Sequence, residues 1–297
     1  MSRPSGDPKP LRKPAWLKRR LPSGPIYGSV CQALGDKGLH TVCQEARCPN
    51  QWECFARQTA AFLILGSRCT RNCRFCAVTH GAPVPPDPDE PERVARMAEE
   101  MGLVYVVVTS VTRDDLADGG AGHFAAVVHA VRNRIAGARV EVLIPDLQGR
   151  RAAIATVVAA GPDVLNHNLE TTPDLYATVR PQAAYARSLA LLQTVRELAP
   201  HMTTKSGLML GLGETRDGVR RTLADLRAVD CNMVTLGQYL QPTPDHLPVR
   251  RYVPPEEFNR WREEALAMGF REAASGPLVR SSYQARELYQ AVRGVRP

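Results

Sequence analysis

The stretch that decides the fold reads CQEARCPNQWEC over Cys43–Cys54 and, after the apolar run AFLIL at Ala61–Leu65, CTRNCRFC over Cys69–Cys76. Six of the eight cysteines fall in these two triplets. Three thiolates in one group suit a soft metal, and three ligands leave one coordination position open. We interpret both triplets as ligands of iron–sulfur clusters, with the open iron of the second cluster available for chemistry.

The rest of the chain has the composition of a globular protein. Its 297 residues suffice for one large α/β domain with short appendages, and its hydrophobic content of 44% is ordinary. The longest apolar runs are too short to cross a bilayer, and Met1–Pro25 lacks the apolar segment of a secretory signal. We therefore expect a cytoplasmic protein without a membrane partner. Thiols stay reduced in the cytoplasm, which favours metal binding over disulfides.

Apolar runs and helix-like stretches alternate from Ala61 onward. Buried strands are expected at Ala61–Leu65, Leu103–Thr109, Val140–Ile144, Val164–Asn168, Gly207–Leu210 and Met233–Leu236. Helices are expected at Glu90–Glu100, His123–Arg134, Arg151–Ala159, Ala183–Leu198, Thr215–Ala228 and Pro255–Met268. Gly102, Gly161 and Gly269 stand where C-terminal caps commonly lie. Strict alternation requires parallel strands with helical crossovers, in either an open doubly wound sheet or a partial barrel.

Polar residues follow several of these strands. They are Thr109-Ser110, Asn166–Glu170, Gly211–Glu214 and Gln238–Gln241, and the second cysteine triplet follows the first strand in the same way. Ligand sites of parallel α/β folds gather at the carboxyl ends of the strands, so we expect one shared cavity there. Residues 1–60 show no clear helix or strand period and are interpreted as an extension that folds around metal.

The second triplet has the spacing C-x3-C-x2-C in the loop after the first strand. A zinc site completed by His80 is the alternative reading. The arrangement resembles the radical S-adenosylmethionine (SAM) enzymes, in which three cysteines hold a four-iron cluster and the open iron binds SAM. Phe75 matches the aromatic residue common in that motif, and Gly207–Glu214 resembles the superfamily's glycine-containing strand near the adenine.

The first triplet, C-x4-C-x5-C, narrows this resemblance to the lipoyl synthase family. Further segments that resemble the family are RKPAWLKRRLP at Arg12–Pro22, VTSVTRDDLADGGA at Val108–Ala121, NHNLET at Asn166–Thr171, GLMLGLGE, GQYLQPT, and RSSY at Arg280–Tyr283. The resemblance implies an α/β fold with a partial (β/α)6 TIM-type barrel over residues 61–270. An N-terminal extension, 1–60, would carry the first triplet, and a C-terminal extension, 271–297, would supply a serine ligand.

The resemblance also implies a role for each ligand. Cys69, Cys73 and Cys76 would hold the cluster that cleaves SAM to a 5′-deoxyadenosyl radical, which removes hydrogen from carbons 6 and 8 of a protein-bound octanoyl-lysyl group. The auxiliary four-iron cluster would donate two sulfur atoms and be consumed. Its ligands would be Cys43, Cys48, Cys54 and Ser282, with Ser281 the less favoured neighbour. From the sequence alone, the two serines would instead cap a helix over Gln284–Val292.

Partners of SAM are expected at the strand ends. The candidates are Thr109, Asn168, Glu170 and Arg180, each of which would otherwise cap a helix or form a surface pair. Asp114 and Asp115 are expected to order a loop. Lys205 is read either as a contact to SAM or substrate, or as a surface lysine. Cys31 and Cys231 are read as small apolar fillers.

The expected partners follow from the same resemblance. They are octanoylated carrier domains (2-oxoacid dehydrogenase acyltransferase subunits and the glycine cleavage H protein), an electron donor such as ferredoxin or flavodoxin, and an iron–sulfur carrier protein. The net charge of +8 would also suit nucleic acid, but we expect none. The basic segment Lys9–Arg20, which includes Trp16, is predicted to dock an acidic carrier domain.

Four other functions are weighed against this one. A tRNA methylthiotransferase lacks the matching auxiliary spacing, and it would have an RNA-binding module. Biotin synthase holds its second cluster within the barrel. A ferredoxin-like carrier or a zinc-dependent nucleic-acid-binding protein would not need six β–α units with polar strand ends.

Overall fold

A curved, mostly parallel sheet organises the part of the chain that the computed structural model describes, residues 11–18, 25–56 and 60–294. Its strands are β1 (His40–Thr41), β2 (Ala61–Ile64), β3 (Tyr105–Ser110), β4 (Arg139–Leu143), β5 (Val164–Asn166), β6 (Thr203–Leu210), β7 (Met233–Gln238) and β8 (Glu272–Gly276). They lie side by side in chain order, and only β1 runs antiparallel to its neighbour. Within the described residues β1 and β8 do not pair, so the barrel stays open.

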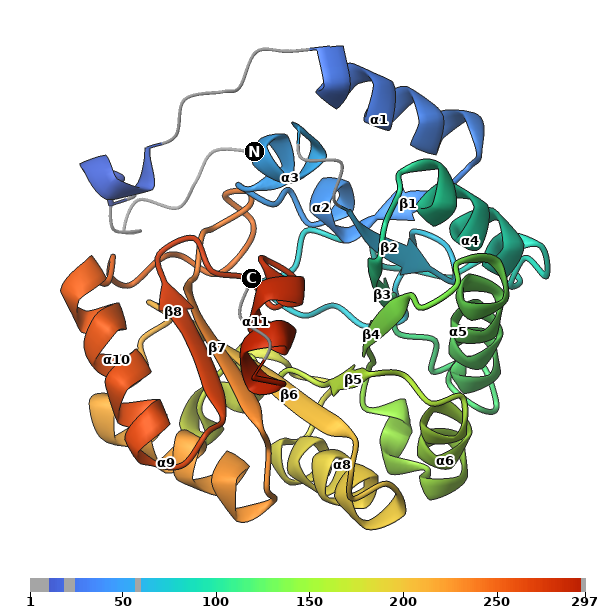
Figure 1. The fold of residues 1–297 in the computed structure, drawn as a ribbon. Coiled ribbons are helices and arrows are strands. Elements are labelled where there is room, and N and C mark those ends of the chain that lie inside the picture. Colours follow the sequence, from blue (N-terminus) through green and yellow to red (C-terminus); the bar gives the residue numbers. More distant parts are fainter. Residues whose placement is uncertain (1–10, 19–24, 57–59, 295–297) are drawn as a thin grey trace.

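Helices surround the outside of this sheet (Figure 1). They are α4 (Glu90–Glu100), α5 (Ala121–Arg134), α6 (Arg151–Ala159), α8 (Tyr185–Leu198), α9 (Arg216–Ala228) and α10 (Pro255–Ala267). The short α7 (Tyr176–Val179) follows β5, and α11 (Ala285–Val292) packs Tyr289 against Val164 and Met233, the first residues of β5 and β7. One end of the barrel is therefore covered by α11, while the carboxyl ends of the strands face the other way.

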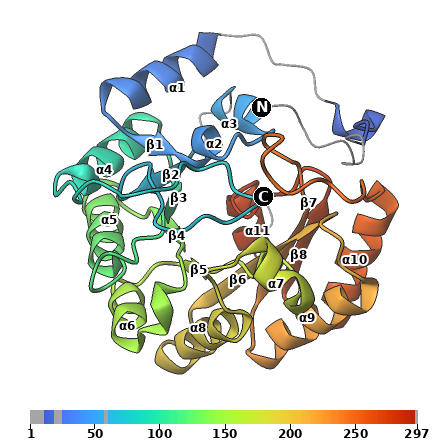
Figure 2. The ribbon, with the colours of Figure 1, turned by 180° about the vertical axis from the view of Figure 1, so that it is seen from behind.

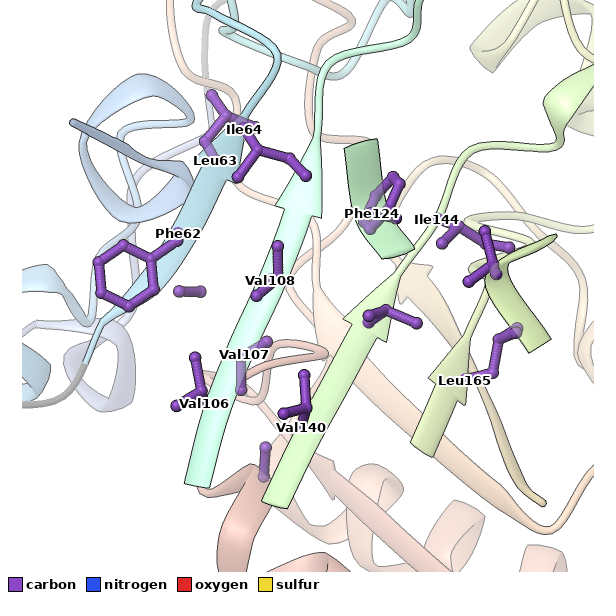
Figure 3. Packing of buried hydrophobic residues seen from close by; sticks show 14 of the residues in the cluster. Phe62, Leu63, Ile64, Val106, Val107, Val108, Phe124, Val140, Ile144 and Leu165 are labelled. Atoms are coloured by element: carbon purple, nitrogen blue, oxygen red, sulfur yellow. The ribbon is translucent and has the colours of Figure 1, made fainter. Parts of the chain in front are cut away.

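The core lies between the sheet and its helices (Figure 3). Phe62, Val108, Phe124 and Val140 are all completely buried there. Side chains alternate along a strand, so the intervening residues point into the barrel. Leu63 of β2 is one of these inward residues, and it lines the cavity described below. The sheet thus presents one apolar face to the helices and one mixed face to the site.

The predicted partial barrel is confirmed. Helices α4 and α6 have the predicted bounds, and the three cap glycines Gly102, Gly161 and Gly269 have positive φ. Two strands, β1 and β8, were not predicted. Strand β6 begins at Thr203 rather than Gly207, because its first half is polar and points toward buried polar partners instead of forming an apolar run.

The expectation that the N-terminal region lacks regular structure is wrong for residues 25–56. It contains α1 (Pro25–Asp36), α2 (Val42–Glu45) and α3 (Gln51–Ala56), which lie beside β1 and β2 in both views (Figures 1 and 2). Tyr27 of α1 stacks on Trp52 of α3, with 4.0 Å between ring centroids, and also contacts the buried Phe55. Aromatic packing therefore holds these short helices together.

The proposed docking segment is only partly described. Trp16 lies in the short helix η1 (Ala15–Leu17) and is exposed, whereas Lys9, Arg19 and Arg20 lie outside the described residues. Among the helices that are described, none is long and apolar enough to span a bilayer.

Candidate metal centre

A cavity of about 520 Å³ opens at the carboxyl ends of the strands. Thiols of both triplets line it, namely Cys43, Cys48, Cys69, Cys73 and Cys76. Cys54 does not line the cavity, but it is close enough to Cys43 to influence the titration of its thiol. His80, the fourth ligand of the zinc alternative, is exposed and does not line the cavity. The structure thus brings cysteines of both triplets to one cavity.

Backbone hydrogen bonds fix the loop that carries the second triplet. The N–H of Cys69 donates to the Thr79 carbonyl at 2.8 Å, and the N–H of Thr70 donates to the Thr112 carbonyl at 3.0 Å. The carbonyl of Cys76 accepts from Nε2 of His246 at 2.9 Å. Because neighbouring elements hold the backbone from several sides, the thiols of this loop are positioned before any ligand binds.

Arg71, inside the second triplet, is a site residue that sequence analysis missed. Its guanidinium is buried and donates in a bidentate manner to Asp114, at 2.6 and 2.8 Å, and to Asp146, at 2.9 and 2.7 Å. Burial alone would raise the pKa of Asp146, but hydrogen bonds from Arg71 outweigh it and lower this pKa to about 2. Asp114 therefore orders the cysteine loop, as predicted, by accepting from Arg71. Asp115 accepts from Nη2 of Arg113 at 2.7 Å and so orders the same connection after β3.

The first triplet is carried by α2, α3 and the turn between them. The side chain of Thr41 caps α2 by accepting from the N–H of Gln44, and the N–H of Cys48 donates to the Cys43 carbonyl at 3.0 Å. Burial, followed by the nearby thiols of Cys48 and Cys54, raises the pKa of Cys43 to about 12. The three sulfur atoms of this triplet are thus close enough to interact electrostatically.

The thiols of the second triplet are also shielded from water. Burial raises the pKa of Cys76 to about 12, and it raises that of Cys73 although the positive charge of Arg180 partly opposes the rise. A desolvated thiolate needs a positive partner, and iron is one that soft sulfur ligands prefer. No three His, Cys, Asp or Glu side chains of the described chain converge on a single ion. The fit to clusters rests on the sulfur donors and the size of the cavity.

The C-terminal segment completes the cavity wall with Ser281 and Ser282. Ser281 is engaged: its Oγ lies 2.7 Å from Nδ2 and 3.0 Å from Oδ1 of Asn168. The hydroxyl of Ser282 has no hydrogen-bond partner among the described residues and faces the cavity. Neither serine caps α11, since its N-cap position is Gln284. Of the two serines, Ser282 is therefore the one whose hydroxyl is free to act as a metal ligand.

The four residues predicted to contact SAM all line this cavity. Thr109 donates to the Leu143 carbonyl at 2.9 Å, and Asn168 donates to the Glu170 carboxylate at 3.0 Å. Glu170 has φ +69, a strained value for a residue with a side chain, and burial raises the pKa of its carboxyl group. Arg180 donates to the Asn168 carbonyl, while its buried Nε has no partner among the described residues. This nitrogen is available to an anionic ligand.

Other predicted residues have structural roles. Lys205 is completely buried and contacts Glu141, so its interpretation as a surface lysine is wrong, and it is not among the residues that line the cavity. The Gln238 side chain holds the end of its strand by donating to the Leu210 carbonyl and accepting from the N–H of Val253. Cys231 is completely buried, as expected of an apolar filler, and Cys31 packs at the edge of the core.

Comparisons with known proteins agree with this geometry. A family model described as the radical SAM superfamily matches residues 63–226, and one described as the N-terminal domain of lipoyl synthase matches residues 2–48. Lipoyl synthase of Desulfotalea psychrophila is 56% identical over 278 residues, which cover 94% of this chain and 93% of the relative. Lipoyl synthase of Caldanaerobacter subterraneus subsp. tengcongensis is 54% identical over 284 residues, which cover 96% of this chain and 99% of the relative.

A solved structure shows similarity of fold alone. Methylornithine synthase superposes with a TM-score of 0.54 at 15% identity, covering 80% of this chain and 72% of that protein.

Proposed function

The chain belongs to the lipoyl synthase family of radical SAM enzymes, and from this premise we propose how its residues divide the work. It is a sulfur-inserting enzyme that acts on protein-bound octanoyl groups, and it uses a four-iron cluster and SAM. We propose that Cys69, Cys73 and Cys76 hold this cluster. We also propose that a second, auxiliary cluster is held by the first triplet and Ser282.

One observation supports the division above all others: thiols of both triplets and the free hydroxyl of Ser282 open onto the same cavity. When bound, the cluster on Cys69, Cys73 and Cys76 would supply, with SAM, a carbon radical strong enough to break unactivated C–H bonds, and the auxiliary cluster would supply the sulfur. A shared cavity lets one aliphatic chain meet both. In this division residues 1–60 carry the first triplet, 61–270 form the barrel and 271–297 supply the serine.

The chain's own residues would position the reactants. The unpaired Nε of Arg180 suits the carboxylate of SAM, and the carboxylate of Glu170 suits its ribose hydroxyls. Asn168 contacts both Glu170 and Ser281, so it lies between the SAM side and the auxiliary side. Leu63, Leu143, Met209 and Val279 line the same cavity and would enclose the octanoyl chain away from water.

The partners are proposed more broadly. An octanoylated lipoyl carrier domain, either an acyltransferase subunit of a 2-oxoacid dehydrogenase or the H protein of glycine cleavage, would present the substrate. Ferredoxin or flavodoxin would supply electrons, and an iron–sulfur carrier would rebuild the auxiliary cluster. A cytoplasmic location is proposed for the same reason as before, since thiol ligands require a reducing compartment.

The test separates the two triplets. Cys73→Ala should abolish cleavage of SAM, because it removes a ligand of the cluster that binds SAM. Cys48→Ala should retain SAM cleavage but lose sulfur insertion into an octanoyl-lysyl peptide. Each protein is reconstituted anaerobically and assayed for iron, 5′-deoxyadenosine and lipoyl product, with Cys31→Ala as the matched control. Loss of SAM cleavage in both variants alike, or product from Cys48→Ala, would contradict the division.

A further inference from the structure

A buried ion pair lies inside the barrel where aliphatic side chains usually pack. Lys205 of β6 and Glu141 of β4 are both completely buried, and Nζ lies 2.8 Å from Oε1. Glu141 also accepts from the hydroxyl of Tyr105 at 2.7 Å. Removing two charges from water is costly, and the attraction between them offsets this cost only when further hydrogen bonds satisfy the groups. Whether this ion pair is stable therefore depends on the other hydrogen bonds of the Lys205 ammonium group.

That partner is the backbone carbonyl of Ser281, 2.5 Å from Nζ. The carbonyl belongs to the connection between β8 and α11, residues 277–284, which contains no helix or strand. The Asn168 side chain holds the Ser281 hydroxyl from the same side. Ser281 is thus fixed at both its backbone and its side chain, and the next residue is the free Ser282.

Two glycines let the connection approach the strands this closely. A Cβ at Gly237 would lie 2.1 Å from the Val279 carbonyl oxygen, and one at Gly207 would lie 3.0 Å from Oγ of Ser281. Asn50, between Cys48 and Cys54, donates to the Leu278 carbonyl at 2.6 Å. The connection is therefore seated between the barrel strands and the segment that carries the first triplet.

We infer that Lys205, oriented by Glu141, is a positioning residue that holds Ser282 at the auxiliary side of the cavity. The inference rests on the proposed function, because it assumes that Ser282 ligates the auxiliary cluster. An alkoxide is a weak ligand for soft iron, so the hydroxyl has to be kept near the metal by its surroundings. Lys205 does this from β6 through the carbonyl of Ser281, the residue before Ser282, and is not itself among the residues that line the cavity.

The test needs a variant that removes the contact without leaving a buried charge. Lys205→Met alone would leave Glu141 unpaired and is expected to fold poorly. The double variant Lys205→Met/Glu141→Gln is neutral and keeps an acceptor for Tyr105. Its new amide can donate to Oδ1 of Asn166, which lacks a partner among the described residues and whose Nδ2 lies 3.4 Å from the Glu141 carboxylate.

Thr204→Val is the matched control. Thr204 is the neighbouring residue on β6, and its hydroxyl contacts Asn232 rather than the connection. Its loss perturbs the same strand and leaves Ser281 untouched.

Two measurements are made on each protein. Hydrogen–deuterium exchange of the cluster-free protein follows peptides that cover residues 278–283, and iron is counted after anaerobic reconstitution. The double variant should exchange about tenfold faster in these peptides, because a charge-assisted hydrogen bond is lost. Its iron content should fall from about eight to about four per chain, because only one four-iron cluster is stably held. Thr204→Val should match wild type in both.

Three results would count against the reasoning, in distinguishable ways. A double variant with wild-type exchange and about eight irons would overturn the role of Lys205 and leave the proposed function standing. Fast exchange with a full iron content would show that Ser282 does not depend on this contact. Wild-type protein that takes up only about four irons would instead refute the auxiliary cluster of the proposed function.

Discussion

His167 should make the free energy of unfolding depend on pH. Its ring is buried, and Nδ1 lies 2.8 Å from the Ile144 carbonyl, which can only accept, so Nδ1 carries the proton. Nε2 then accepts from the Ser188 hydroxyl at 2.9 Å. Ser188 in turn accepts from Tyr176 at 2.7 Å, and Tyr176 accepts from Arg180 at 2.9 Å. These directions hold for a neutral imidazole, whereas a proton on Nε2 would reverse the bond to Ser188.

The magnitude follows from the shift in pKa. Burial, reinforced by the positive charge of Arg180, lowers the pKa of His167 from 6.5 to about 4. Below pH 6.5 His167 binds a proton in the unfolded chain, whereas in the folded chain it binds one only below about pH 4. Stability is therefore full above pH 6.5 and is lost as the pH falls toward 4. The shift corresponds to about 3 kcal/mol in total, of which about 2 kcal/mol is lost between pH 7 and pH 5.

The assay is urea unfolding of the cluster-free protein at pH 7 and pH 5. His167→Gln does not titrate in this range, so the stability of wild type relative to this variant should fall by about 2 kcal/mol between the two pH values. The exposed His129 provides the control, since His129→Gln should show no such pH-dependent difference. A relative stability that is constant, or that rises at pH 5, would refute a neutral buried imidazole.

Two further substitutions test the loops around the cavity. The Glu214 carboxylate accepts three consecutive backbone N–H groups at 2.7–3.1 Å, so Glu214→Gln should lower the unfolding free energy by about 2–4 kcal/mol, measured by urea unfolding. The surface-exposed Glu197→Gln should change it little, and equal losses would contradict the reasoning. Gly237→Ala should displace Val279, and with it the connection that carries Ser282, and so reduce the iron content to about four per chain after anaerobic reconstitution. A Cβ at Gly28 would meet no atom within 4 Å, so Gly28→Ala should leave the iron content unchanged.

The sequence predicts those parts of the fold that depend on local pattern. Apolar runs identified β2, β3, β4 and β7, and cap glycines identified three helix ends. Strand β8 reads EAASG, and its small and polar residues give no apolar run, although it pairs with β7 along its whole length. The short N-terminal helices are held by contacts such as Tyr27 on Trp52, which no local period reveals. Tertiary packing, and not local periodicity, therefore determines that β8 and the short N-terminal helices form.

The same limit applies to the site. Cysteine spacing and polar strand ends indicated most of the polar residues that line the cavity, because both signals are local in the sequence. The expectation is wrong for Gly211–Glu214, which do not line it, because the Glu214 carboxylate binds the N–H groups of its own loop. The partners of Arg71 lie 43 and 75 residues away, and Lys205 and Glu141 are 64 residues apart. A charged residue in a strand gives no sign of whether it faces solvent or an opposite charge across the barrel. Pairings of this kind become visible only when the fold is known.

The open barrel itself is suited to a substrate tethered to another protein. In a closed (β/α)8 barrel, layers of branched side chains fill the interior. Here Gly207 and Gly237 remove side chains from two neighbouring strands, and the space they leave admits the connection that carries Ser282. The hydroxyl of Tyr283 lies 3.1 Å from Glu53 of α3, so the connection that follows β8 contacts the helix that carries Cys54. Under the proposed function, a fatty chain that enters at the strand ends would reach both the thiols of the second triplet and those of the first triplet within this one cavity.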